Sequence, residues 1–469
     1  DNVDALNSYA FSYCSGISQL KISSNLKKIC SYAFYFCDGL LNLSIPDSVT
    51  ELCDHAFSHC SSINNLKIGR NLREIGENAF EYCSGLTSLE IPNWITSINS
   101  EAFAFCTGIK GKLTIPDSVA LIECAAFAHC TGITSLKIGR NINKISSYVF
   151  SNCIGLESLS IPETVTSIGS YSFANCVGIE GSLEIPDSVI NLDDFAFSHC
   201  SGFTELKIGH GIKETGQNVF EYCSSLSNLS IPEWVTSIGS SAFSYCRGIT
   251  GTLTIPDSVK KLGNHAFSHC TGIESIIFSR NVEEISDCLF EYCSNLKELS
   301  IPEWISEIGS FAFFYCTGIT GTVVIPDTVK SIENQAFSHC SGFTDLKISK
   351  GVTEIKETVF GYCSSLKCLE IPESILSIDS YAFSYCTGLT GTLTIPDTVT
   401  TVKSYAFTHC SGFTDLKMGQ QLTEIESDVF SYCEGLRSLK IPENILSIGS
   451  YAFSHCSGIK GTLEIPDTV

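Results

Sequence analysis

The 469-residue sequence has little of what membrane-spanning and nucleic-acid-binding proteins need. It contains no run of about eighteen apolar residues, so no segment is expected to span a bilayer. Cations are scarce, with 28 Lys and Arg against 50 Asp and Glu, and the net charge of −22 would repel phosphates. Nucleic acid is therefore excluded as a partner. The sequence does contain 43% hydrophobic residues, which is ample for an ordered core.

Recognisable catalytic patterns are also missing. The sequence has no Cys-x-x-Cys pair, no phosphate-binding glycine loop and no evident Ser-His-Asp arrangement. An active site needs a constellation that occurs once, whereas almost every polar residue here has a counterpart 70 residues away. We therefore expect no enzyme, no catalytic residue, no cofactor and no metal site.

An internal repeat organises the chain. A segment of the type Ala-Phe-x-x-Cys recurs twenty times at spacings of 23 or 24 residues. From Cys60 onward the spacing follows the order 23, 23, 24, so three coils form a 70-residue unit. No linker interrupts the pattern, which predicts one continuous solenoid over 1–469. The marker cysteines are Cys14, Cys37, Cys60, Cys83, Cys106, Cys130, Cys153, Cys176, Cys200, Cys223, Cys246, Cys270, Cys293, Cys316, Cys340, Cys363, Cys386, Cys410, Cys433 and Cys456.

One coil, residues 156–179, shows the expected local structure. Apolar residues at every second position predict a short strand at 159–161, which ends at a proline, and a second extended piece follows at 165–168. Ser170 is expected to cap a short helical turn over 171–176. A single coil cannot bury its own apolar edge, so stacking into short parallel strands provides the core.

The 24-residue coils each contain one additional glycine between the marker Cys and the strand. A glycine inserted beside a strand predicts a β-bulge that restores the register. These glycines are Gly111, Gly181, Gly251, Gly321, Gly391 and Gly461.

Segment 159–176, Leu-Ser-Ile-Pro-Glu-Thr-Val-Thr-Ser-Ile-Gly-Ser-Tyr-Ser-Phe-Ala-Asn-Cys, closely resembles the BspA-like leucine-rich repeat. The resemblance covers essentially the whole chain, although every third coil has Lys-Ile-Gly, as at 67–69, in place of the Ile-Pro pair. It implies a leucine-rich-repeat solenoid, curved or twisted and right-handed, with a parallel sheet on one side. It also implies a secreted or surface-exposed protein that acts in adhesion and has no catalytic residues.

The cysteines fall into two groups. The marker cysteines lie beside an inward Phe and are expected to be buried thiols, with inter-coil disulfides or metal binding as alternatives. Cys30 and Cys53 share another phase in adjacent coils, and we predict that they form a disulfide in an oxidising compartment. Cys124, Cys288 and Cys368 are expected to be isolated.

The repeat predicts two outward columns of side chains. An aromatic or His residue precedes most marker cysteines, as at His59 and Tyr82, which predicts inter-coil stacking or a lateral contact surface. The residue after Ile-Pro or Ile-Gly forms a charge ladder, in which two carboxylates usually alternate with one cation. This ladder is interpreted as cross-strand pairing of side chains or as a surface that loosely holds a divalent cation. Its members include Asp117, Arg140, Glu163, Asp187, Glu233, Asp257, Arg280, Glu303, Asp327 and Lys350.

Further candidates interrupt the regular surface. Trp94, Trp234 and Trp304 follow a proline by two residues, and they are interpreted as contact aromatics or as side chains partly buried under neighbouring loops. The sequons at Asn42 and Asn228 are candidate N-glycosylation sites if the protein passes through a secretory route.

The function remains open between two classes. The leading hypothesis is a non-enzymatic scaffold at a cell surface or outside the cell that adheres to a protein or matrix ligand. The sequence starts and stops within the repeat, so uncapped ends are expected, either in a segment of a longer protein or in a unit that joins copies of itself. The alternative is therefore a structural subunit of an extracellular filament.

Overall fold

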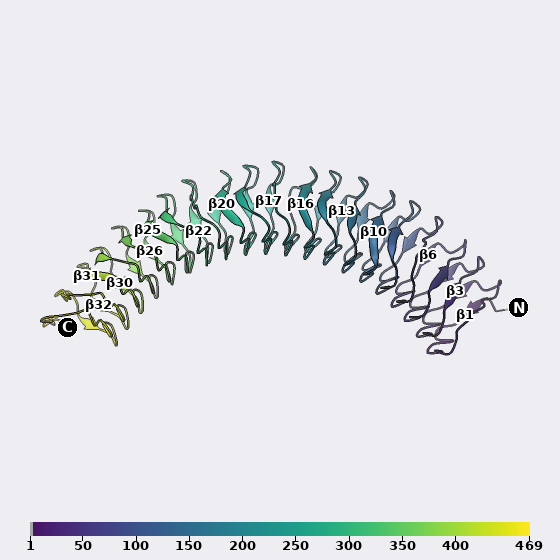
Figure 1. Ribbon diagram of the computed structural model, residues 1–469, viewed down its shortest axis with the longest axis horizontal. Helices are drawn as coiled ribbons and strands as arrows, with labels where there is room; N and C mark the ends of the chain where they lie inside the picture. Colours follow the sequence, from purple (N-terminus) through teal and green to yellow (C-terminus); the bar gives the residue numbers. More distant parts are fainter. Residues whose placement is uncertain (1–2) are drawn as a thin grey trace. The chain divides into compact units, whose positions relative to one another are not determined.

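The computed structural model describes residues 3–469, and the chain divides into two compact units, Asp1–Val235 and Thr236–Val469. Within each unit, coils of 23 or 24 residues lie side by side in sequence order (Figure 1). No residue between 3 and 469 belongs to a helix. The fold is a parallel-strand solenoid of the leucine-rich-repeat type, as predicted. A single continuous solenoid over 1–469 stays a prediction.

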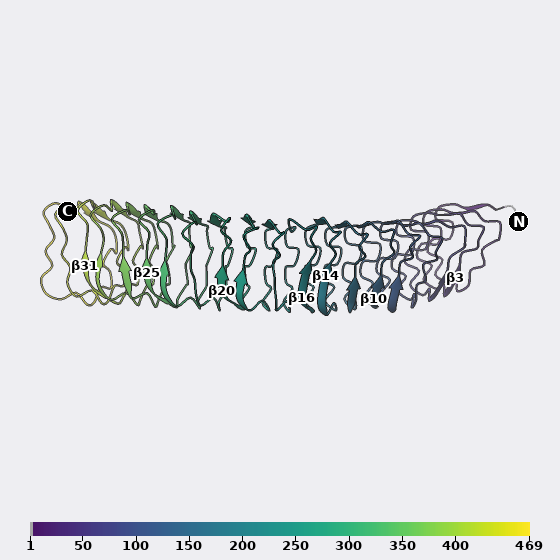
Figure 2. The same cartoon turned by 90° about the horizontal axis from the view of Figure 1, so that it is seen from above.

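Two rows of parallel strands run through each unit, as the arrows in Figure 2 show. One row contains strands of three to six residues and the other contains strands of two. In unit 1 the longer row contains β3 (Asn42–Ser44), β5 (Asn65–Lys67), β8 (Gly111–Thr114), β10 (Ile133–Lys137), β12 (Ser158–Ser160), β14 (Gly181–Ile185) and β16 (Phe203–Ile208). In unit 2 it contains β18 (Gly251–Thr254), β20 (Ile273–Ile277), β23 (Gly321–Val324), β25 (Phe343–Lys347), β27 (Cys368–Glu370), β29 (Gly391–Thr394) and β31 (Phe413–Lys417).

The two-residue strands pair in the same way as the longer ones. In unit 1 they are β1 (Ala5–Leu6), β2 (Lys28–Ile29), β4 (Glu51–Leu52), β6 (Glu74–Ile75), β7 (Ser97–Ile98), β9 (Leu121–Ile122), β11 (Lys144–Ile145), β13 (Ser167–Ile168) and β15 (Asn191–Leu192). In unit 2 they are β17 (Ser237–Ile238), β19 (Lys261–Leu262), β21 (Glu284–Ile285), β22 (Glu307–Ile308), β24 (Ser331–Ile332), β26 (Glu354–Ile355), β28 (Ser377–Ile378), β30 (Thr401–Val402), β32 (Glu424–Ile425) and β33 (Ser447–Ile448).

The register places equivalent residues of consecutive coils opposite each other. Leu136 pairs with Leu159 in the longer row, and Ile145 pairs with Ile168 in the shorter row. At the inserted glycines the backbone is left-handed, with φ of 76° at Gly111, and the register between β8 and β10 shifts at that point. The same shift occurs beside Gly181, Gly251, Gly321 and Gly391, so the predicted bulge is confirmed.

The predicted helical turn over 171–176 is wrong. The segment forms tight turns in which Tyr171 and Asn175 have φ of 58° and 60°, a conformation outside the right-handed helix. The N–H of Cys176 closes a turn onto the Phe173 carbonyl at 3.2 Å, but the N–H of Phe173 donates to Ala196 of the next coil at 2.9 Å. Because alternate N–H groups point to the following coil, they are not available for helical hydrogen bonds.

Phenylalanine forms the centre of the core. Phe150, Phe173 and Phe197 are at most 1% exposed, and their rings stack at centroid distances of 5.5 and 5.2 Å. Such offset stacking is a favoured aromatic geometry, and burying each ring contributes about 1.5–3 kcal/mol. The column recurs in unit 2, for example from Phe337 to Phe360 at 5.6 Å.

The marker cysteines line this column as thiols. Cys153 is 1% exposed, and its Sγ donates to the Phe127 carbonyl of the preceding coil at 3.3 Å. The Sγ of Cys176 makes the equivalent hydrogen bond to Phe150 at 3.2 Å. Burial raises the pKa of Cys153 to about 12. Each buried thiol therefore packs as a small apolar group and also satisfies a carbonyl of the neighbouring coil.

Candidate interaction surface

The charge ladder lies at the turn that follows the longer strands. Asp117 Oδ1 accepts a hydrogen bond from the backbone N–H of Arg140 at 2.8 Å, and Asp257 accepts one from Arg280 at the same distance. Asp187 and Asp327 bond in the same way to the next coil, at His210 and Lys350. The ladder thus joins coils, as expected, but the main partner of each aspartate is a backbone N–H.

Side-chain ion pairs add to some of these contacts. The His210 Nδ1 lies 2.8 Å from Asp187 Oδ1, and the Arg280 Nε lies 4.0 Å from Asp257 Oδ2. The backbone hydrogen bond from His210 is the main cause that lowers the pKa of Asp187. These groups are exposed, so solvent screens the ion pairs and they add little to stability. The ladder therefore sets the register of neighbouring coils and contributes little to their stability. Glu163, Glu233 and Glu303 are exposed on the same face.

The three tryptophans lie over the coil that precedes them. The indole Nε1 of Trp94 donates to the Gly69 carbonyl, and that of Trp234 to the Gly209 carbonyl, both at 2.9 Å. Trp304 bonds to the Ser279 carbonyl at 3.0 Å but remains 38% exposed. The tryptophans therefore satisfy backbone groups, and Trp304 also presents an apolar surface to the solvent. Their role in contact with a ligand stays a prediction.

The aromatic and His column stacks between coils. His59 and Tyr82 lie with ring centroids 4.5 Å apart, and Phe105 and His129 lie 4.2 Å apart. Each of these residues has a positive φ close to 60°, which aligns the side chains in one direction. Inter-coil stacking, the first of the two expectations for this column, is confirmed.

The sequons and the cysteines outside the marker column lie at or near the surface. Asn42, on β3, and Asn228 are both exposed, and their glycosylation stays a prediction. Cys30 and Cys53 are half-buried free thiols in adjacent coils, and Cys53 Sγ lies 3.5 Å from Glu51 Oε1. Their disulfide stays a prediction.

An apolar depression of about 600 Å³ interrupts the polar surface of unit 2. Ile277 at the end of β20 is 55% exposed, Val324 at the end of β23 is 48% exposed, and Trp304 lies in the turn of the intervening coil. Glu303 is its charged lining residue. In other units the position of Ile277 holds lysine and that of Val324 holds mainly threonine, as at Lys347 and Thr394. Comparison of the repeats could have found this patch, and our sequence analysis missed it.

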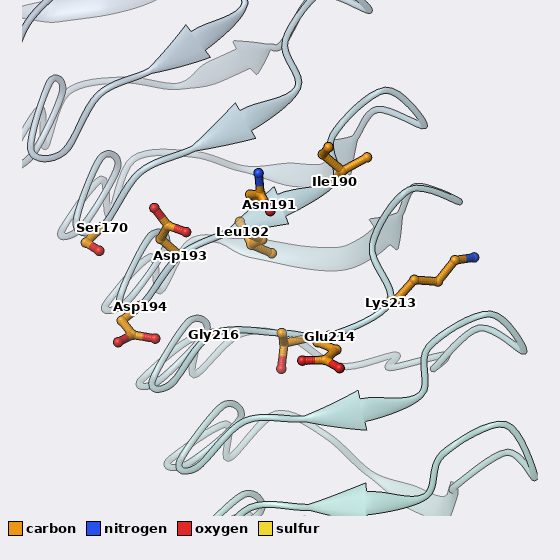
Figure 3. A pocket seen from close by; sticks show the side chains of 10 residues that line it. Ser170, Ile190, Asn191, Leu192, Asp193, Asp194, Lys213, Glu214 and Gly216 are labelled. Carbon is orange, nitrogen blue, oxygen red and sulfur yellow. The ribbon is translucent and has the colours of Figure 1, made fainter.

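A second depression, of about 500 Å³, lies in unit 1 beside β15. Figure 3 shows Asp193 and Asp194 near Ser170 at one end and Lys213 extending away at the other. Glu214 adds a third carboxylate, so this depression is acidic. It forms where Thr215 replaces the inward isoleucine of the other units and where the two-residue strand is reduced to a single bridge.

The matched family is the BspA type leucine-rich repeat region, whose model fits residues 4–134, 111–180, 143–274, 260–390 and 390–469. No curated protein matches the sequence. Among solved structures, the chain is similar to a leucine-rich repeat protein from Bacteroides ovatus ATCC 8483, with 21% identity, 85% of this chain and 94% of that chain covered, and a TM-score of 0.60. It also matches a leucine rich cell surface protein from Faecalibacterium prausnitzii A2-165, with 26% identity, coverage of 71% and 86%, and a TM-score of 0.45.

The structural likeness to the B. ovatus protein supports the fold, and the family match extends over nearly the whole chain. Both agree with the stacked coils of parallel strands. The chain belongs to the BspA type leucine-rich repeat family.

Proposed function

We propose that this protein is a non-enzymatic scaffold outside the cell or on its surface that adheres to a protein ligand. Membership of a family of repeat scaffolds supports this function, and the apolar depression formed by Ile277, Trp304 and Val324 is the observation that carries it. A regular solenoid has no structural need for apolar side chains at positions that are polar in its other coils. Exposed apolar groups with a polar rim are typical of protein contact sites.

The charge of the surroundings indicates the chemistry of the ligand. Glu303 borders the apolar depression, and the whole chain carries a net charge of −22. A ligand segment that presents an apolar side chain beside lysine or arginine fits both features, because opposite charges accelerate encounter and the apolar contact provides affinity.

The test uses the full chain and a panel of purified extracellular matrix proteins immobilised on a biosensor. Replacing Ile277→Lys and Val324→Thr together restores residues that the other units carry at these positions. We expect the double variant to lose at least about tenfold in affinity, since losing apolar anchors costs more than about 1.4 kcal/mol.

The matched control is Ile190→Thr, which removes a 60% exposed isoleucine of unit 1 and introduces the residue found at Thr50 and Thr400. It is expected to bind as the unchanged protein does. If no matrix protein binds, the proposed function is wrong; if the double variant binds equally well, the assigned surface is wrong.

A subunit of an extracellular fibre is the second candidate function. The repetition of near-identical 70-residue units supports it, because a surface that binds one ligand usually varies along its length. Electron microscopy of the purified protein separates the two candidates. Indefinite filaments support the fibre, and discrete particles of one length support the scaffold.

A further inference from the structure

Three side chains with different donor atoms meet on the surface of unit 2. They are His265, Cys288 and Glu291, and their nitrogen, sulfur and oxygen donors all lie within 4.8 Å of one another. The His265 Nδ1 is 3.5 Å from Glu291 Oε2. Two ligands that bind one tetrahedral zinc ion at about 2.0–2.1 Å stand about 3.4 Å apart, so this spacing suits a shared metal.

The backbone of adjacent coils holds the three residues in place. His265 and Cys288 occupy the same left-handed position of consecutive coils, with φ of 60° and 55°. The N–H of His265 donates to the Asp287 carbonyl at 3.0 Å, and the N–H of Cys288 donates to the Ser310 carbonyl at 2.8 Å. The backbone of both residues is therefore held in place, and their side chains project from adjacent coils toward the same site.

Neighbouring groups orient the carboxylate. The Ser268 hydroxyl donates to Glu291 Oε2 at 3.4 Å and also lies 2.8 Å from His269 Nδ1. The Glu291 side chain is only 17% exposed, whereas that of His265 is 47% exposed. The Ser268 hydroxyl can therefore hold the Glu291 carboxylate in position for metal binding, and the exposed His265 side of the cluster leaves room for water.

The combination occurs once in the repeat. Other units place His, Asn and Glu, or Gln, Thr and Gly, or Tyr, Asp and Ser at these three positions. The cluster is thus not needed for stacking the coils. The corresponding residues are His55, Asn78 and Glu81; Gln335, Thr358 and Gly361; and Tyr405, Asp428 and Ser431.

We propose that His265, Cys288 and Glu291 bind one zinc ion, with a water molecule as the fourth ligand. An imidazole, a thiolate and a carboxylate are the ligand types that zinc accepts, whereas calcium and magnesium require oxygen ligands. The thiolate and the carboxylate together balance the charge of the ion. Cys288 loses its thiol proton on binding, and His265 binds through a neutral ring nitrogen.

Protons and zinc compete for the same cluster. Hydrogen bonds to Cys288 and then to Glu291 raise the pKa of His265 to about 10. Metal binding therefore displaces protons from this cluster and weakens as the pH falls.

The test titrates Co²⁺ and then Zn²⁺ into the reduced, chelator-treated full chain. We expect one equivalent of Co²⁺ to produce a thiolate-to-cobalt charge-transfer absorption, and one equivalent of Zn²⁺ to remove it. Cys288→Thr is expected to abolish the absorption, and His265→Gln is expected to weaken binding at least about 10-fold. Both substitutions introduce residues that the chain carries at the same phase, at Thr358 and Gln335, so the coils should still stack.

The control variant is Cys368→Ser, which removes an exposed cysteine of the same unit and introduces the residue found at Ser438. It should keep the absorption and the affinity. Thermal melting followed by circular dichroism verifies that every variant is folded. The proposal is overturned if the unchanged protein binds no stoichiometric zinc, or if the absorption persists in the folded Cys288→Thr variant.

Discussion

At the residue scale, cysteine has different chemistry at different phases of the coil. Most marker cysteines are buried and donate to a carbonyl of the preceding coil, as Cys153 does to Phe127 at 3.3 Å. Burial raises the pKa of Cys153 and of Cys386 to about 12, so their reactive thiolates are rare at neutral pH. Cys368 and Cys124 are exposed.

Native-state alkylation is therefore expected to distinguish these cysteines. Iodoacetamide at neutral pH should modify Cys368 first, and Cys124 more slowly because burial raises its pKa, while Cys153 and the other buried marker cysteines react only after unfolding. Peptide mass spectrometry of native and urea-treated samples measures this order. Early labelling of Cys153 in the folded protein would contradict its position in the core.

The same measurement tests the disulfide predicted for Cys30 and Cys53. Without reductant, a disulfide leaves both residues unlabelled and gives a cross-linked peptide that disappears after reduction. Labelling of both half-buried thiols in the non-reduced protein would reject the bond.

At the element scale, the histidines in the stacked aromatic and His column make the stability of the folded coils depend on pH. Burial lowers the pKa of His129 and His339, whose rings stack on Phe105 and Tyr315. In the unfolded chain a His has its ordinary pKa near 6.5, so the unfolded state binds more protons than the folded state below that pH. The histidines with a lowered pKa are His59, His129, His269, His339 and His409.

The melting temperature is therefore expected to fall as the pH decreases from 7.5 to 5. His265 acts in the opposite sense, since its pKa is raised to about 10 and its stabilising contribution fades as the pH rises above 6.5. The contribution of His265 is complete below pH 6.5, so in the acid part of this range the five histidines with lowered pKa act without opposition from it. His129→Phe introduces the residue of the neighbouring coil at Phe105 and should reduce the pH dependence. A melting temperature that is flat over this range, or that rises on acidification, would refute the assignment.

The strands were more predictable than the turns. The repeat period and the apolar alternation predicted both rows of strands, because a solenoid brings equal positions of successive coils together, as at Leu136 and Leu159. The segment 171–176 was misassigned because a capping serine and a short apolar spacing fit one coil considered alone. The N–H groups of Tyr171 and Phe173 bond to the next coil, and local sequence carries no signal for that choice.

The repeat period predicted some residues of the candidate sites but not the contacts that these residues make. The ladder aspartates were predicted from periodicity, although the bond from Asp117 to the backbone of Arg140 was not. The zinc cluster was missed because His265 and Glu291 belong to different positions of different coils. Cys288 was expected to be isolated, but stacking places it beside both residues.

At the scale of the whole molecule, each coil contacts mainly the coils before and after it. The stability of such a protein is approximately a sum of terms for single repeats and for neighbouring pairs. Removing one complete 70-residue unit preserves every phase, while removing half a unit places unlike residues in contact.

Deleting residues 311–380 is accordingly expected to leave a folded protein. The new junction joins Ser310 to Tyr381, which restores the Gly-Ser-Tyr sequence present at 169–171. Far-ultraviolet circular dichroism should show an unchanged signal per residue and a cooperative melt. Deleting residues 311–345 is the control, and it should aggregate or melt without cooperativity. Equal behaviour of the two deletions would show that phase does not govern folding.

The hydrogen bonds of the tight turns also determine when each coil can finish folding during synthesis. The N–H of Phe173 bonds to Ala196 and that of Phe150 to Ser172, so the turns of each coil gain these partners from residues made one coil later. At about 5–20 residues per second, a ribosome needs on the order of 1–5 s to produce the missing partner. The nascent chain therefore always carries one incomplete coil outside the ribosome, and its exposed apolar edge is the surface that a chaperone would meet.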